Sequence, residues 1–358
     1  MGEPRVDSEN APHLAVPEGD ALRGLRPEGP EPFLRGAPWP GTRRVPYPRA
    51  NPIDRSRIPG DTWMVASLPV GVRLEVVGDA TAIEIEYRTT TDQLGYRGEG
   101  AGVRFTAWAG TRRLGDAPAV LGEGTVSLPL ATDGSVTSVH LPEGMQPWIL
   151  TVRGVGGTIE PAPARPRWVV YGDSVAEGWI ASEPALAWPA IAGREHGLDH
   201  VNLGYAGAAR GELASAEQIA KLPADVLTVA HGTNCWSRTP HSVDQIRANT
   251  DAFLTVLRQE HPSTPIVVVS PVIRPDAEAT PNRFGASLAD LRRGIEGVVE
   301  VRMAAGDRNL TLVPGLAIVP PERLGDAIHP DDDGHHAIAD AVGRAVIAAL
   351  GSEVAGGR

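Results

Sequence analysis

Five residues in the second half of the chain have groups suited to acyl transfer. Ser174 follows Gly-Asp at the end of an apolar run, where a strand-to-helix turn would expose its hydroxyl and backbone N–H. Gly207 offers a second backbone N–H, and Asn234 a side-chain amide, for a developing oxyanion. His329 can take the serine proton, and Asp326, three residues earlier, is near enough to fix its tautomer.

The elements expected to position these residues are short apolar runs that alternate with segments of helical period. The runs are 168–171, 201–203, 226–230, 266–269 and 310–313, and the clearest helical segments are 243–257, 288–298 and 338–346. This alternation predicts a parallel sheet with helices on both faces. Ligands bind beyond the carboxyl ends of such strands, where Ser174, Gly207 and Asn234 fall.

The first half of the chain has a different period. Val72, Leu74 and Val76, then Ile83 and Ile85, alternate with polar residues, which predicts half-buried strands. We therefore expect a Pro- and Gly-rich tail over 1–40, a β-sandwich or jelly roll over 41–157, a proline-rich linker over 158–166 and an α/β domain over 167–352. The apolar end of the tail, Phe33, Leu34 and Trp39, is expected to dock on the folded body.

The order of the motifs resembles that of the SGNH family of GDSL esterases and lipases. The sequences YGDSVAEGW, NLGYAGAARGE, AHGTNCW and DAIHP carry the resemblance, which covers about residues 167–350. It implies a flavodoxin-like three-layer fold with a five-stranded sheet and assigns the four family residues to Ser174, Gly207, Asn234 and His329. Asp326 then completes Asp-x-x-His. Ser174, Gly207 and Asn234 would form the oxyanion hole.

Two positions depart from the pattern of this family. Cys235 stands where an aspartate often follows the asparagine, and Glu177 stands where an uncharged residue is common. Neither change removes a catalytic atom. The β-rich first half is similar to the arrangement in two-domain carbohydrate esterases, some of which use a Ser–His pair alone. Trp236, Tyr205 and Trp179 are candidates for the wall of the substrate pocket.

Composition excludes several other classes of protein. The chain has 33 Lys and Arg against 44 Asp and Glu, a net charge of −11, and lacks the basic patch that nucleic acid or an anionic membrane surface requires. A single cysteine and the lack of an apolar leader or 18-residue apolar run favour a cytoplasmic protein. The glycine spacing matches no nucleotide-binding loop, so we expect no cofactor.

Simpler interpretations compete at three positions. The simpler interpretation of Ser174 is a helix N-cap, which is the commonest use of Asp-Ser at the start of a helix. The acidic run 331–333, with His329 and His335, has metal-binding residue types, but aspartates at a helix start more often cap it. Cys235 lacks a base in a matching motif and fits a packing role.

Three functions follow from these features. The first is hydrolysis of a short acyl ester, such as an acetate on a sugar or glycosylated small molecule, through an acyl-enzyme on Ser174. The second is an acyltransferase that uses the same site and replaces water by an alcohol. The third is a carbohydrate-binding protein whose α/β domain is inactive. The expected partner is thus a small-molecule ester.

Overall fold

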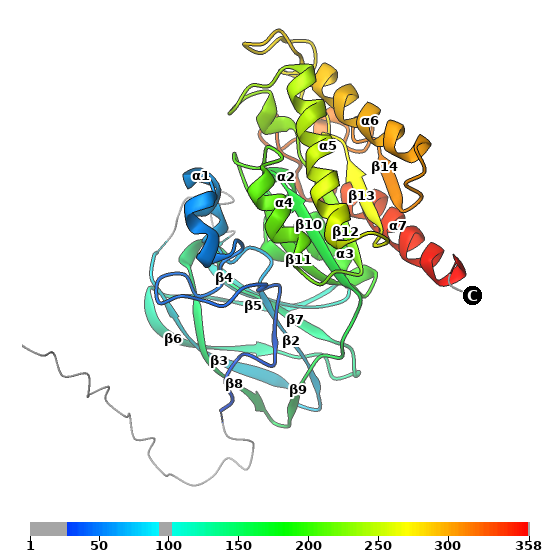
Figure 1. Cartoon of the computed structure of the whole chain (residues 1–358). Coiled ribbons are helices and arrows are strands. Elements are labelled where there is room, and N and C mark those ends of the chain that lie inside the picture. The colour runs from blue at the N-terminus through cyan, green and yellow to red at the C-terminus, as the bar shows by residue number, and fades with distance from the viewer. Residues whose placement is uncertain (1–26, 93–101, 357–358) are drawn as a thin grey trace, which may run out of the picture.

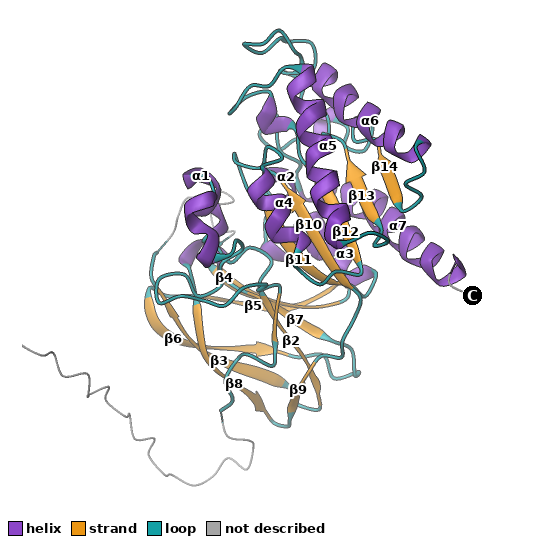
Figure 2. Cartoon of the chain, in the orientation of Figure 1, coloured by secondary structure: helices purple, strands orange, loops and turns teal. Residues whose placement is uncertain are grey.

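The computed structural model describes residues 27–92 and 102–356 of the 358-residue chain, so most of the expected tail lies outside it (Figure 1). Two antiparallel sheets pack face to face in the first half, which confirms the β domain (Figure 2). The larger sheet contains β1 (Leu34–Arg35), β2 (Arg73–Gly78), β4 (Arg104–Ala109), β5 (Arg112–Pro118), β7 (Thr137–His140) and β9 (Ile159–Pro161). The smaller sheet contains β3 (Ala82–Thr89), β6 (Gly122–Pro129) and β8 (Trp148–Val155).

The period of two places apolar side chains between these sheets. Ile83 and Ile85 of β3 are fully buried and share one core with Leu74 and Phe105 of the other sheet. Glu84, between the two isoleucines, points away from the core and accepts a hydrogen bond from Arg153 at 2.6 Å. The alternation in sequence therefore decides which face of each strand is covered.

Several elements of this half were not predicted. Helix α1 (Gly60–Ala66) and strands β5 and β9 are additions, and β9 pairs with β2 at the start of the segment expected to be a linker. Phe33 is fully buried in the β core, and Trp39 packs against the core of the second half. The apolar end of the tail thus docks on both halves.

The second half is the predicted three-layer α/β fold. Its sheet has the order β11-β10-β12-β13-β14, all parallel, which is the flavodoxin-like order. The strands are β10 (Arg167–Gly172), β11 (Asp199–Gly204), β12 (Val226–Ala230), β13 (Ile266–Val269) and β14 (Leu310–Val313). The helices are α2 (Ser174–Glu177), α3 (Trp188–Glu195), α4 (Leu213–Ala220), α5 (Val243–Glu260), α6 (Leu288–Ala304) and α7 (Asp332–Gly356).

Successive residues of β10 belong to different cores, as expected for a sheet covered on both faces. Val169 and Tyr171 pack with α4, α5 and α6, whereas Trp168 and Val170 pack with α3 and α7. Ala66 of α1 also belongs to the first of these cores, so the amino-terminal half contributes to the packing of the second. Within the described ranges, no helix has both the length and the apolar character needed to cross a membrane.

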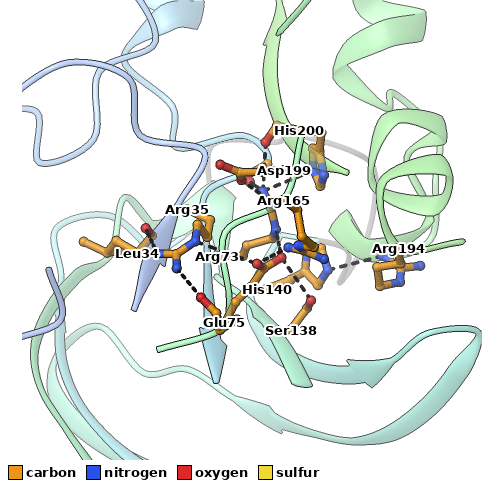
Figure 3. A network of polar contacts seen from close by, with 12 residues as sticks. Leu34, Arg35, Arg73, Glu75, Ser138, His140, Arg165, Arg194, Asp199 and His200 are labelled. Carbon is orange, nitrogen blue, oxygen red and sulfur yellow. Dashed lines mark hydrogen bonds and ion pairs between the residues drawn. The ribbon is translucent and has the colours of Figure 1, made fainter. Parts of the chain in front are cut away.

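A buried polar network joins the two halves at the amino-terminal end of β11 (Figure 3). Arg73 of β2 is 1% exposed and donates to Asp199 Oδ1 at 3.0 Å, to the carbonyl of His200 at 2.9 Å and to Glu75 at 2.7 Å. Burial alone would raise the pKa of Glu75, but Arg73 and Arg165 outweigh it and hold the pKa below its usual value. Buried ion pairs therefore join the two halves at the amino-terminal end of β11, which is the end away from Ser174.

Candidate active site

Ser174 occupies a tight turn between β10 and α2. Asp173 caps the helix, because its Oδ1 accepts the backbone N–H of Val175 at 3.0 Å. A Cβ atom on Gly172 would lie 2.5 Å from the Cβ of Ala176, so only glycine lets the chain turn this closely. Burial raises the pKa of Asp173 to about 6, despite the N–H donors of the turn. The turn presents Ser174 at the carboxyl end of the sheet.

His329 and Asp326 meet Ser174 from the loop that precedes α7. His329 Nε2 lies 2.9 Å from Ser174 Oγ, and His329 Nδ1 lies 2.7 Å from Asp326 Oδ2. The other carboxylate oxygen of Asp326 accepts the N–H groups of Ile328 at 3.0 Å and His329 at 2.7 Å. Ala327 adopts a left-handed conformation, φ 67°, which closes this turn. With Nδ1–H donating to Asp326, Nε2 is free to accept the serine proton.

The surroundings favour a neutral imidazole at His329 and a charged carboxylate at Asp326. Burial lowers the pKa of His329, and the hydrogen bond and charge of Asp326 offset this effect only in part. Burial would raise the pKa of Asp326, but hydrogen bonds from the His329 side chain and backbone lower it below its usual value. At neutral pH the pair therefore consists of a neutral imidazole and a carboxylate.

Gly207 and Asn234 lie beside the serine on two other loops. Gly207 has φ 69°, a left-handed conformation that favours glycine, and Asn234 is 5% exposed in a 3-10 turn, Thr233–Cys235, after β12. Both residues line the same cavity as Ser174. Gly204, the first glycine of the same loop sequence NLGYAG, ends β11 and packs against the backbone of Glu177. The expected donors and Ser174 therefore share one cavity, and the Asn234 amide lies 3.5 Å from the carbonyl oxygen of Ala209.

The cavity above Ser174 has a volume of about 670 Å³ and is walled by both halves of the chain. It is lined by Met64, Val65, Leu68, Gln146, Ser174, Trp179, Ala206, Gly207, Thr233, Asn234, Ser237, Arg238, Arg274, Ile328 and His329. The lining is mainly apolar, and of its two arginines Arg274 is paired with Asp276, whose Oδ1 lies 2.9 Å from Arg274 Nε. Sequence reasoning missed Met64, Val65 and Leu68, because seven residues of α1 are too few to establish a helical period.

Only one of the three predicted wall residues lines this cavity. Trp179 does so, with its ring 6.0 Å from that of His329. The prediction was wrong for Tyr205, which is 2% exposed and lies in the core beneath the loop. It was also wrong for Trp236, whose indole N–H donates to the carbonyl of Thr280 at 2.8 Å and whose ring lies under the Arg274 guanidinium. Trp236 therefore supports a wall residue rather than forming the wall.

The structure gives Cys235 and the acidic run 331–333 structural roles, in packing and in hydrogen bonding near the start of α7. Cys235 is fully buried, and burial raises the pKa of its thiol far above the usual value, which disfavours a thiolate nucleophile. Asp331 accepts the backbone N–H of Gly334 at 2.8 Å at the start of α7, and Asp332 accepts both donors of Ser182. Over residues 27–92 and 102–356, no cluster of His, Cys, Asp or Glu is arranged to hold a metal ion.

The fold and the contents of this cavity define the chain as a hydrolase with a three-layer α/β core. Residues 165–347, just over half of the chain, match the model of the GDSL-like lipase/acylhydrolase family. The protein belongs to that family. No curated protein sequence gives a significant match.

Solved structures resemble nearly the whole chain, the β domain included. A salicylyl-acyltransferase, SsfX3, from a tetracycline biosynthetic pathway is 26% identical with a TM-score of 0.78, over 92% of this chain and 99% of that one. A protein from Bacteroides ovatus described as a GDSL-like lipase is 21% identical, with a TM-score of 0.75 over 91% and 98%. The acetyl xylan esterase Est2A from Butyrivibrio proteoclasticus is 14% identical, with a TM-score of 0.58 over 92% and 99%. The two halves therefore recur together as one fold.

Proposed function

We propose that the chain hydrolyses a short-chain ester of a sugar or glycosylated small molecule through an acyl-enzyme on Ser174. The observation that carries this proposal is the chain of contacts from Ser174 Oγ to His329 Nε2 and from His329 Nδ1 to Asp326, at 2.9 and 2.7 Å. Such contacts are those that a serine nucleophile and its base require. Family membership and the esterases among the similar structures support the same reaction.

In the proposed mechanism, Ser174 Oγ attacks the ester carbonyl and its proton passes to His329 Nε2. The N–H groups of Ser174 and Gly207 and the amide of Asn234 stabilise the oxyanion. The C–O bond then breaks, and the alcohol leaves with the proton from His329. Water attacks the acyl-enzyme by the same route in reverse and releases the acid.

The cavity supports a substrate whose alcohol part is much larger than an acetyl group. Its apolar wall offers contact area, and Arg238, together with the Arg274 Nη1 group that does not donate to Asp276, offers donors to the oxygen atoms of a sugar or polyol. A panel of para-nitrophenyl esters with acyl chains of rising length, together with acetylated sugars, tests this proposal. We expect the acetate to be cleaved faster than long-chain esters and an acetylated glycoside to compete with it. A preference for long acyl chains would contradict the short-chain assignment.

Acyl transfer to an alcohol is the second candidate function. It is favoured by one observation, the likeness over nearly the full length to a salicylyl-acyltransferase at 26% identity. Both reactions share the acyl-enzyme and differ in whether water or an alcohol reaches it. Mass spectrometry of the products, with and without added sugar or polycyclic alcohols, separates them. A new ester that forms faster than free acid would establish transfer as the main reaction.

The pH dependence of hydrolysis follows from the state of His329. The base must be neutral, and its pKa lies below the usual value of about 6.5 because the imidazole is buried. As pH falls through that lowered pKa, His329 becomes protonated and kcat/KM declines. We therefore expect full activity at pH 7 and an acidic limb with its midpoint below 6.5, measured with a neutral ester. A midpoint above 7 would contradict this assignment of the base.

A further inference from the structure

We propose that Arg49 and Glu177 are positioning residues that hold the oxyanion loop, residues 204–207, in register with the nucleophile. Arg49 lies between β1 and α1 in the amino-terminal half, and Glu177 is the last residue of α2. Both side chains are completely buried, and their charged atoms lie 3.5 Å apart. This inference rests on the proposed function, because it concerns how the same site is assembled.

Glu177 links the nucleophile helix directly to the oxyanion loop. It lies three residues after Ser174, and its Oε2 accepts the backbone N–H of Ala206 at 2.8 Å, one residue before Gly207. The loop leaves little room for another arrangement, since a Cβ atom on Gly204 would lie 2.3 Å from the Glu177 backbone nitrogen. A shift of Glu177 therefore changes where the Gly207 N–H points relative to Ser174.

Arg49 connects this carboxylate to the amino-terminal wall of the cavity. Its Nε and Nη2 donate to the carbonyls of Leu68 and Val65, each at 2.7 Å, and both of these residues line the cavity. Its Nη1 donates to the carbonyls of Asn202, at 3.3 Å, and Gly204 at the end of β11. One planar guanidinium thus joins the substrate wall to the strand that leads into the oxyanion loop.

The two buried charges of the pair lie next to each other and are of opposite sign. A neutral glutamine at position 177 offers an oxygen for the Ala206 N–H as well as glutamate does. A carboxylate in this dry position requires a buried cation, which Arg49 supplies. Lysine does not substitute for Arg49, because one ammonium group lacks the rigid fork that reaches carbonyls on opposite sides. The pair therefore makes the cavity wall and the oxyanion loop a single unit.

The test compares Arg49→Lys, Glu177→Ala and Glu177→Gln with the wild-type full chain, using para-nitrophenyl acetate. Activity is expressed per folded molecule, with the folded fraction taken from the thermal unfolding curve of each variant. Because small displacements of catalytic groups are costly, we expect kcat to fall by about 10- to 100-fold in Arg49→Lys and Glu177→Ala, with little change in KM. Binding of phenylboronic acid, whose serine adduct places an oxygen in the oxyanion hole, should weaken in proportion. Glu177→Gln keeps the acceptor for Ala206 and should retain more kcat than Glu177→Ala.

Arg73→Lys is the matched control. Arg73 is equally buried and also joins the two halves, but it contacts the opposite end of β11. We expect this variant to lower the midpoint of thermal unfolding while kcat and boronate affinity stay at wild-type values. The proposal is overturned if Arg49→Lys and Glu177→Ala keep wild-type kcat per folded molecule, or if Arg73→Lys loses as much kcat as they do. Failure of the proposed function is a separate result, since wild type itself would then cleave no ester.

Discussion

Replacing Ser174 with alanine is expected to lower kcat for ester hydrolysis by about 10⁴-fold or more, because among the described residues that line the cavity only Ser174 has its hydroxyl in contact with an imidazole. Ser174 Oγ is the hydroxyl that contacts the His329 imidazole. Initial rates with para-nitrophenyl acetate measure the effect. KM is expected to change much less than kcat, because the cavity wall remains intact. Labelling by a fluorophosphonate probe should disappear in the same variant.

Ser237→Ala provides the matched control for this substitution. Ser237 lines the same cavity, but its hydroxyl approaches the carbonyl of Thr233 at 3.5 Å rather than a histidine. It should keep wild-type kcat within a few-fold and remain labelled. If Ser174→Ala kept wild-type activity, or if folded wild type took up no label, the nucleophile assignment would fail. The second result would favour a binding protein with an inactive α/β domain.

Replacing Asp326 with asparagine is expected to lower kcat by about 10³- to 10⁴-fold while the fold is kept. Asparagine fills the same space, but its amide presents either a neutral oxygen or an N–H to His329 Nδ1. The imidazole then loses the carboxylate that stabilises its protonated form during the reaction. Because Asp326 raises the pKa of His329 against the effect of burial, the acidic limb of the pH profile should also move to lower pH. Rates measured from pH 4 to 8 report both effects.

Asp332→Asn is the comparison for Asp326→Asn. Asp332 belongs to the same acidic region, but it accepts hydrogen bonds from Ser182 and has no contact with the imidazole in the described structure. We expect it to leave kcat near the wild-type value. A wild-type rate in Asp326→Asn would instead mean that Ser174 and His329 act as a pair alone.

The features that the sequence predicted are those whose position depends on residues nearby in the chain. The Gly-Asp-Ser turn places the serine just beyond the carboxyl end of β10, and Asp326 reaches His329 within one turn. The period-two pattern of β3 and the apolar runs of the parallel strands likewise depend on local burial. These features made the fold class and the candidate triad accessible from the sequence.

The misplaced residues depend on contacts between distant segments. Tyr205 was expected in the pocket because it follows β11, but Arg49 and the core cover it. In the sequence, Glu177 was recognisable only as a charge at a position that is commonly uncharged. Its contact with Arg49 could not be predicted, because Arg49 lies 128 positions earlier in the chain. Val65 and Leu68 likewise reach the cavity only after the two halves have packed together. No spacing rule connects positions this far apart.

Because α1 lines the cavity from the other half of the chain, the residues that contact substrate can change separately from the residues proposed to react. The proposed reacting groups Ser174, Asp326 and His329 belong to the half with the parallel sheet, whereas Met64 of α1 lines the cavity from the other half and is 69% exposed. A residue this exposed tolerates many substitutions at little cost in stability. Mutations at this position can therefore alter which alcohols fit without touching the chemistry, and related chains can diverge in substrate while they keep one reaction.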